Sequence, residues 1–149
     1  MGSIITQATS ADLDRIFEIE NQSFGAEKFS RRQLAYLINR AKGIFYILKS
    51  GDKIVAYMSL LHRPKTNVLR IYSIAVHPSE RGKHFSDKLI TTAIEYAKQK
   101  QLKIVSLEVK TTNLPAIGLY EKYGFVQKTI KKEYYTDGTD ACIMRLKIE

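Results

Sequence analysis

Residues 68–110 read VLRIYSIAVHPSERGKHFSDKLITTAIEYAKQKQLKIVSLEVK, and the order of their periodicities determines the topology. The segment 68–76 is rich in β-branched and apolar residues, which is typical of a strand. Apolar residues between Leu89 and Ala97 then recur at the spacing of an amphipathic helix. Residues 103–110 alternate apolar and polar side chains and predict a second strand. A strand, a helix and a strand in this order predict two parallel strands joined by a right-handed crossover.

The N-terminal flank adds strands and helices of its own. Ile4 and Ile5 indicate a short strand, and the spacing from Thr9 to Asp12 is that of a capping box before a helix. Ser30 begins a second capping box and a helix that ends at Gly43, and residues 25–29 between the helices lack periodicity and predict a loop. Residues 44–48 and 54–61 are expected to form an antiparallel meander with 68–76.

The C-terminal flank predicts a capped helix and a hairpin. Asn113 can cap a helix with Pro115 in its first turn and Gly124 just past its end. Residues 125–135 and 139–148 are expected to pair as a hairpin around Asp137 and Gly138. We therefore expect a single α/β domain over residues 1–149, with a mixed, mostly antiparallel sheet of about seven strands and about four flanking helices.

Length and composition limit the classes of function. The chain has 149 residues, with 44% hydrophobic and 26% charged residues, so disordered, collagen-like and coiled-coil architectures are excluded. Lys and Arg exceed Asp and Glu by nine, which favours a partner with negative charge, such as a phosphorylated cofactor. The charge is spread evenly, +5 over residues 1–75 and +4 over 76–149, so nucleic acid is not expected as the primary ligand.

The features that sort proteins to other compartments are not recognisable in this sequence. The chain has one cysteine, no N-terminal segment of secretory type and no apolar run of the roughly 20 residues that span a bilayer. We expect a cytoplasmic protein without a membrane partner. No spacing of His, Cys or carboxylates suggests a metal site.

Residues 81–86, RGKHFS, lie between the predicted strand and the long helix. Backbone N–H groups and the helix dipole can hold phosphate at such a place, and Arg81 and Lys83 add positive charge. A solvated turn with two incidental basic residues is the alternative from these six residues alone. The segment lacks the glycines of a P-loop or a dinucleotide-binding fingerprint.

Three motifs resemble the GNAT family of N-acetyltransferases. The first is the family's acetyl-coenzyme A signature, V-x-P-x-x-R/Q-G/R-x-G-x-G/A, which Val76, Pro78, Arg81 and Gly82 match. The others are LEVKTTN with AIGLYEKYGF, at 107–113 and 116–125, and YYTDGTDACIM at 134–144, which is similar to the branch that acetylates protein N-termini. The resemblance extends from residue 4 to residue 146.

His84 and Ser86 depart from the signature, which has small residues at both positions. A positive φ at His84 would be strained and its side chain could crowd the pyrophosphate, lowering cofactor affinity. The alternative is that both residues are helical and point away.

The resemblance implies acetyl-coenzyme A as co-substrate and assigns residues to it. The backbone of the strand end would pair with the pantetheine arm and polarise the thioester carbonyl, and the loop would hold the phosphates. The implied contacts are Ile74, Ala75, Val76, Arg81, Gly82, Lys83, His84, Phe85, Ser86 and Asn113. For Asn113 a plain helix cap is the alternative.

Glu108 and Tyr120 are the candidate catalytic residues. Glu108 lies on the strand face opposite Leu107 and Val109, in a strand expected at the sheet centre, where a carboxylate is costly to bury. The resemblance makes it the general base, and makes Tyr120 the general acid for the coenzyme thiolate. The alternatives are a carboxylate paired with a lysine and a core aromatic.

An acceptor groove is implied by aromatic residues and one further glutamate. The family positions point to Tyr72, Tyr134 and Tyr135, and the loop before the second helix contributes Phe29 and Glu27. Glu27 is also an alternative base.

The implied function is transfer of acetyl from acetyl-coenzyme A to a primary amine, first of all a protein N-terminal α-amine. An α-amine of pKa near 8 costs roughly 1.4 kcal/mol to deprotonate at pH 7, and a lysine roughly 4.6 kcal/mol. The alternatives are a small-molecule or lysine acetyltransferase of this fold, and a non-catalytic acetyl-coenzyme A-binding regulator. The basic surface also suggests an acidic or ribosome-bound acceptor.

Overall fold

The chain forms strands and helices in the expected order. The computed structural model describes residues 2–24 and 27–149. The strands are β1 (Ser3–Gln7), β2 (Gly43–Ser50), β3 (Lys53–His62), β4 (Val68–Val76), β5 (Ile104–Lys110), β6 (Val126–Lys131) and β7 (Ala141–Lys147). The α-helices are α1 (Leu13–Ser23), α2 (Arg31–Asn39), α3 (Phe85–Gln99) and α4 (Leu114–Lys122), and short 3₁₀ turns precede α1 and α3. None of these helices is long and apolar enough to cross a bilayer.

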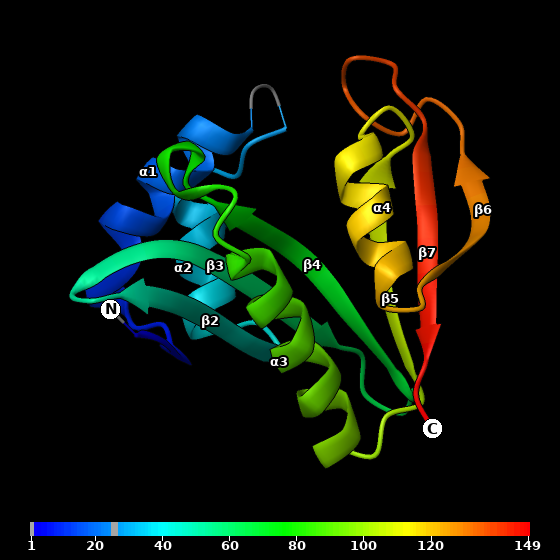
Figure 1. Cartoon of the computed structure of the whole chain (residues 1–149), viewed down its shortest axis with the longest axis horizontal. Helices are drawn as coiled ribbons and strands as arrows, with labels where there is room; N and C mark the ends of the chain where they lie inside the picture. The colour runs from blue at the N-terminus through cyan, green and yellow to red at the C-terminus, as the bar shows by residue number, and fades with distance from the viewer. Residues whose placement is uncertain (1, 25–26) are drawn as a thin grey trace.

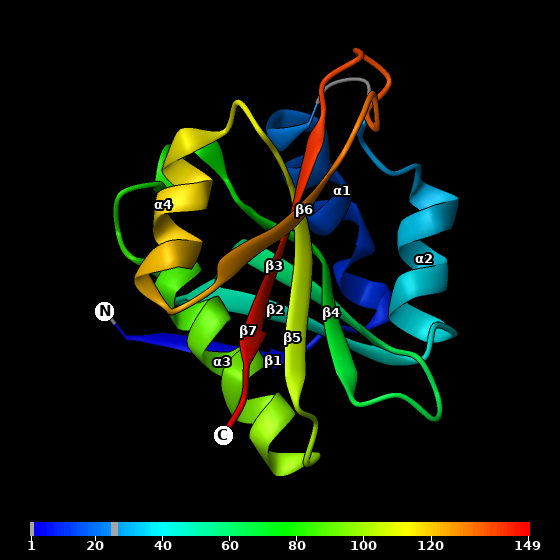
Figure 2. The same ribbon diagram turned by 90° about the vertical axis from the view of Figure 1, so that its right-hand side faces the viewer.

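All the strands belong to one sheet with the order β1-β2-β3-β4-β5-β7-β6. Only β4 and β5 pair in parallel, and the other neighbours are antiparallel. This confirms the predicted mixed, mostly antiparallel sheet and the β4-α3-β5 crossover. Figure 2 shows α3 and α4 on one side of the sheet and α1 and α2 on the other.

Two apolar clusters hold the helices on the two faces. One joins α3 and α4 to the sheet through residues such as Leu89, Ala93 and Leu107, and the other joins α1 and α2 to β2 and β3 through Ile16 and Leu34. The side chains of all five are at most 2% exposed. Both faces of the central strands are therefore buried, which explains their nearly continuous apolar runs.

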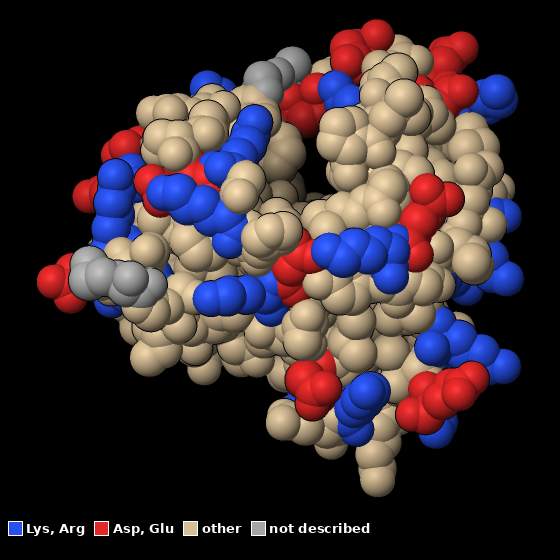
Figure 3. Space-filling view, viewed as in Figure 1, with Lys and Arg blue, Asp and Glu red and all other residues tan. Residues whose placement is uncertain are grey.

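A bulge in β4 opens the sheet. Ser59 pairs with Ser73 and Leu60 with Ile71, so Tyr72 is an extra residue in β4. Bulges bend a strand and increase its twist. Residues 68–71 of β4 pair with 104–107 of β5, whereas the remaining residues of the two strands do not pair with each other. Figure 1 shows the two strands diverging from this point, and Figure 3 shows a hollow in the surface between the two halves.

The C-terminal hairpin differs from the expectation. Its strands end at Lys131 and begin again at Ala141, so 132–140 is a loop and Tyr134 and Tyr135 do not lie in a strand. The loop is folded by its own hydrogen bonds: the Asp140 carboxylate accepts from the Glu133 backbone N–H at 2.9 Å, and the Tyr135 N–H donates to the Thr139 carbonyl at 3.1 Å. Of the predicted loop at 25–29, residues 25 and 26 lie outside the described residues.

Candidate active site

The loop before α3 forms a concave backbone site at the diverging ends of β4 and β5. A small pocket of about 190 Å³ is lined by the loop and the first turn of α3, including Arg81, Gly82 and Ser86. Within the described residues, no hydrogen bond uses the backbone N–H groups of 82–86. Such a run of unpaired N–H groups at a helix N-terminus is suited to a phosphate, so the loop fits the diphosphate of coenzyme A.

His84 adopts the strained conformation that one of the two expectations required. Its φ is +62°, in the left-handed region, where a residue other than glycine is disfavoured. Its imidazole is 80% exposed, and His84 is one of the residues that line the pocket. The alternative of a helical His84 is wrong, whereas Ser86 does lie in α3.

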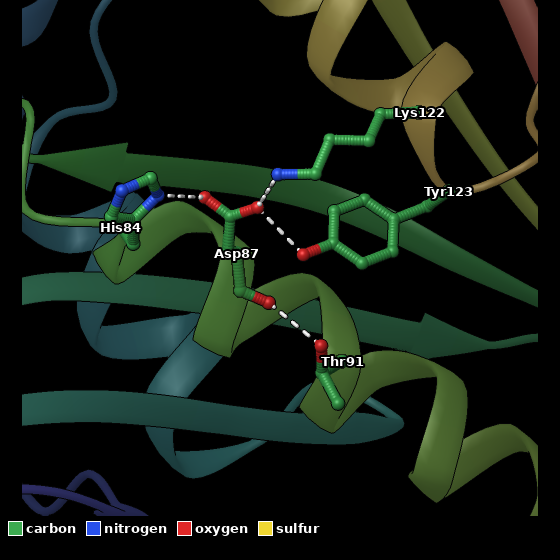
Figure 4. A network of polar contacts seen from close by, with 5 residues as sticks. All are labelled: His84, Asp87, Thr91, Lys122 and Tyr123. Carbon is green, nitrogen blue, oxygen red and sulfur yellow. Dashed lines mark hydrogen bonds and ion pairs between the residues drawn. The ribbon is translucent and has the colours of Figure 1, made fainter.

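Asp87 ties the start of α3 to the end of α4 (Figure 4). Its carboxylate accepts from Lys122 Nζ at 2.7 Å and the Tyr123 hydroxyl at 2.6 Å, and one oxygen lies 3.3 Å from His84 Nδ1. The pKa of Asp87 is lowered to about 2, and the hydrogen bond from Lys122 is the largest cause. Because this carboxylate is neutralised by its own partners, it opposes an anion in the loop less than a free carboxylate would. Figure 3 shows cationic and anionic side chains interspersed over this face.

The end of β4 offers an unpaired edge. After the bulge, Ile74, Ala75 and Val76 pair with β3 on one side, and β5 has already turned away on the other. Ala75 and Val76 are buried, so the side chains of these two residues are packed while their outward backbone groups are free to pair. This geometry supports the prediction that an extended amide chain such as pantetheine binds along this edge.

Glu108 lies in β5, the fifth strand of the sheet, and its side chain is 13% exposed. Its Oε1 accepts from Arg70 Nη2 at 2.6 Å. Its Oε2 is buried and has no hydrogen-bond partner within the described residues. The partner is thus an arginine and not the lysine of the alternative interpretation, and one carboxylate oxygen remains available for a ligand. A buried unpaired carboxylate oxygen is costly in a structure and is typical of a functional site.

Tyr120 is buried in α4, 7% exposed, with its ring centroid 5.8 Å from that of Phe125. Burial raises the pKa of its phenol to about 12, so it carries its proton at neutral pH. Asn113 caps α4, since its Oδ1 accepts from the Ala116 N–H at 3.3 Å. The cap interpretation is confirmed, and the Asn113 amide N–H₂ group is left for a contact with the cofactor.

Phe29 and Tyr72 face each other across the mouth of the site. Their rings are stacked with centroids 5.4 Å apart, and the Arg70 guanidinium lies 4.9 Å from the centroid of Tyr72. Arg70 therefore contacts both Glu108 and Tyr72. Sequence reasoning missed Arg70, although it precedes Tyr72 by two residues and so could have been expected near the same face of the strand.

Tyr134 and Tyr135 lie next to each other in the loop between β6 and β7. Their rings meet edge to face at 5.0 Å, and Lys110 and Lys131 each lie over one of the rings. The Tyr134 hydroxyl lies close to the Glu108 carboxylate, and the interaction between the two side chains is the largest cause of the raised pKa of Tyr134, followed by burial. Burial raises the pKa of Tyr135 to about 12, followed by the charges of Glu108 and other groups that include Tyr120. Tyr134 and Tyr135 therefore both lie close enough to Glu108 to feel its charge.

Glu27 joins the two loops around the site. Its Oε1 accepts from the Thr136 backbone N–H at 2.7 Å and also from the Thr136 hydroxyl. Lys110 lies 3.8 Å from its other oxygen and donates to Asp137 at 2.8 Å. The hydrogen bonds from Thr136 lower the pKa of Glu27. Its carboxylate is thus engaged in fastening the loops, which favours Glu108 as the base.

Glu20 is a buried carboxyl that sequence reasoning missed. It is 1% exposed, and its carboxylate accepts from the Phe29 N–H at 2.8 Å and from the hydroxyl of Tyr57. That hydroxyl also lies 3.1 Å from Ser73 Oγ in β4. Burial raises the pKa of Glu20 to about 7. Its position four residues after Ile16 on the apolar stripe of α1 was the available signal.

Comparison with known proteins gives a consistent result. A model described as the Acetyltransferase (GNAT) family matches residues 13–125. A Bacillus subtilis protein provisionally named ribosomal protein bS18-alanine N-acetyltransferase is 32% identical, over 92% of this chain and 90% of its own. N-alpha-acetyltransferase RimI of Mycobacterium tuberculosis is 31% identical over 92% and 87%. The crystal structure of the Escherichia coli ribosomal-protein-S18-alanine N-acetyltransferase has a TM-score of 0.90, at 27% identity over 99% and 95%.

Proposed function

Because the chain belongs to the acetyltransferase (GNAT) family and is an acetyl-coenzyme A-dependent N-acetyltransferase, we propose that its acceptor is the N-terminal α-amine of a protein. The names of the relatives make a ribosomal protein such as bS18 the first acceptor to test. Such an acceptor would be met in the cytoplasm.

The observation that carries the proposal is the unpaired Oε2 of Glu108. It lies on a groove that also exposes Phe29 and Tyr72, and the unpaired edge of β4 lies beyond the bulge at Tyr72. A primary ammonium has three donors, one of which can reach this oxygen. The two aromatic rings can contact the first side chain of a peptide.

Glu108 is proposed as the general base and Tyr120 as the general acid. Acetyl-coenzyme A supplies the thioester carbonyl that the amine attacks. Glu108 takes one proton from the ammonium, directly or through a water, so that the nitrogen lone pair forms the N–C bond. As the C–S bond breaks, the phenol of Tyr120 donates its hydrogen bond or its proton to the departing sulfur. The residues return to their starting states by exchanging protons with solvent.

The chemistry of the base favours an α-amine. An α-ammonium of pKa near 8 costs roughly 1.4 kcal/mol to deprotonate at pH 7, against roughly 4.6 kcal/mol for lysine. A single carboxylate base can therefore deprotonate an α-ammonium more easily than a lysine ammonium. A small polyamine or a lysine side chain is the second candidate, because Glu108 does not by itself distinguish between amines.

The test compares three acceptors at equal concentration. These are an alanine-initiated peptide with an internal lysine, the same peptide with a blocked N-terminus, and spermidine. We expect acetyl-coenzyme A turnover with the free peptide only, with the acetyl group found on the α-amine by mass spectrometry. Turnover that prefers spermidine or the blocked peptide would contradict the proposed acceptor.

Two variants test the residue roles. Glu108→Gln should lower kcat by about 100-fold or more. Tyr120→Phe should lower kcat more than it raises KM. Glu95→Gln, an exposed carboxylate on α3, is the matched control and should be unchanged. Unaltered turnover in both site variants would refute the mechanism while leaving the acceptor test intact.

A further inference from the structure

A groove of about 1020 Å³ runs along the sheet from Glu108 to the turn between β3 and β4. One wall is α2 with that turn, the other is formed by β6 and β7, and β4 and β5 form the floor. Figure 2 shows α2 and the β3–β4 turn on one side of β4 and β5, with β6 and β7 beside β5. The groove is far larger than one amino acid requires.

The lining of this groove is strongly basic. Glu108 is the only carboxylate among the described lining residues, and it is paired with Arg70. Within the described part of the chain, Arg32, Lys42, Arg63 and Arg145 make no ion pair. The cationic lining residues are Arg32, Lys42, Arg63, Arg70, Lys131 and Arg145. Apart from Arg70, which is paired with Glu108, these cations have no ion-pair partner within the described residues, and their charge favours an anionic occupant.

The strand register places these charges at peptide spacing from the base. Ser106 pairs with Arg70 on one side and with Arg145 on the other, and it precedes Glu108 by two residues. At about 3.3 Å per residue, the Arg145 level lies roughly 7 Å from Glu108, and Val68 lies two residues further along. An extended peptide whose amine reaches Glu108 would bring its third residue to Arg145 and its fourth and fifth residues toward Arg63.

The loops on the other side of Glu108 are fastened to each other. Glu27 accepts from Thr136, and Lys110 contacts both Glu27 and Asp137. An acceptor polypeptide that extended from Glu108 toward these loops would have to break these contacts. The groove under α2 is already open and continuous with Glu108.

We propose that this groove binds an acidic segment of the acceptor polypeptide, at about the third to fifth residues from the acetylated N-terminus. This inference rests on the proposed function, because the polypeptide is held at Glu108 by its α-amine. A nucleic acid is the less favoured occupant, since the groove begins at a carboxylate that repels phosphate.

The experiment uses three peptides that share the first two residues Ala-Ser and carry three Glu, three Gln or three Lys at positions three to five. We expect kcat/KM to fall in the order Glu, Gln, Lys, with at least about tenfold between the first and the last, mainly through KM. Raising NaCl from 0.05 to 0.5 M should remove most of the difference.

Variants assign the effect to the groove. Arg63→Gln with Arg145→Gln should abolish the preference while kcat for the Gln peptide is kept. Arg40→Gln removes the same charge from the end of α2, outside the lining, and should leave the preference unchanged. Equal kcat/KM for all three peptides would overturn the inference and leave the proposed function standing, whereas no acetylation of any peptide would refute that function.

A uridine 12-mer added as competitor covers the other occupant. We expect no inhibition at 0.15 M NaCl. Competitive inhibition that is lost in the double variant would assign the groove to nucleic acid and overturn the proposal.

Discussion

Glu20 makes the stability of this protein depend on pH. Its carboxyl is buried, and burial raises its pKa from 4.5 to about 7. Below pH 4.5 the group is protonated in both the folded and the unfolded chain. Between pH 4.5 and 7 the unfolded chain loses this proton while the folded chain keeps it, so rising pH favours unfolding. At 1.36 kcal/mol per pKa unit, the free energy of unfolding should fall by about 3 kcal/mol by pH 8.

Glu20→Gln should remove this dependence. The amide can still accept from the Phe29 N–H and donate to the Tyr57 hydroxyl, but it carries no charge at any pH. Urea denaturation followed by circular dichroism at pH 5, 6, 7 and 8 would give the free energy of unfolding of each protein. The difference between variant and wild type should grow with pH toward about 3 kcal/mol in favour of the variant.

Taking the difference between the free energies of unfolding of the variant and the wild type cancels the contributions of histidines and other groups that titrate in the same pH range. Glu95→Gln, on the exposed side of α3, is the control and should give a difference that does not change with pH. A flat difference for Glu20→Gln, or one that shrinks as the pH rises, would refute the reasoning.

Four further substitutions test the backbone at Gly43, Gly118 and His84 and the contacts of Asp87. Gly43→Ala should lower the free energy of unfolding, measured by urea denaturation, by about 2 kcal/mol or more, because the new Cβ would lie 1.8 Å from the Leu60 carbonyl oxygen. Gly118→Ala in α4 should raise the free energy of unfolding by about 0.5–1 kcal/mol, because its Cβ would meet no atom within 4 Å. His84→Gly should raise it by about 1 kcal/mol by relieving the positive φ, and an equal gain from His84→Ala would contradict this cause. Asp87→Asn should lower the free energy of unfolding by about 1 kcal/mol at pH 7, which is less than the full pKa shift would give because the partners of Asp87 are partly exposed. A carboxyl whose pKa is lowered in the folded protein stabilises it above the pKa of the unfolded chain, and this stabilisation is lost as the pH falls toward 2. The effect of the substitution should therefore vanish at low pH.

Local sequence patterns predicted much of the fold. The capping box at Ser30 forms as predicted, with the Gln33 N–H donating to Ser30 Oγ at 3.1 Å, and Asn113 caps α4. These motifs involve residues three apart in the chain, so their geometry depends little on the rest of the molecule. The position of residues 81–86, between β4 and the first turn of α3, is predictable for the same reason.

Other features depend on contacts between distant segments. The loop at 132–140 is held partly by Thr136 against Glu27, which is 109 residues away, and no local pattern records that contact. The positive φ of His84 was one of two alternatives until the structure placed it at the start of α3. The burial of Glu20 required the packing of α1 on β3 and β4.

The sequence by itself determined the order of the strands and helices and the parallel crossover around α3, and its resemblance to the family made Glu108 and Tyr120 the candidate catalytic residues. Only the tertiary structure decided that β4 bulges at Tyr72, that Arg70 meets one oxygen of Glu108 and leaves the other unpaired, and that a basic groove leads away from it. The physical reason is register. Periodicity specifies which side chains share a face within one element, whereas the alignment of neighbouring strands, on which a charge pair and a groove depend, is set by the packing of the whole sheet.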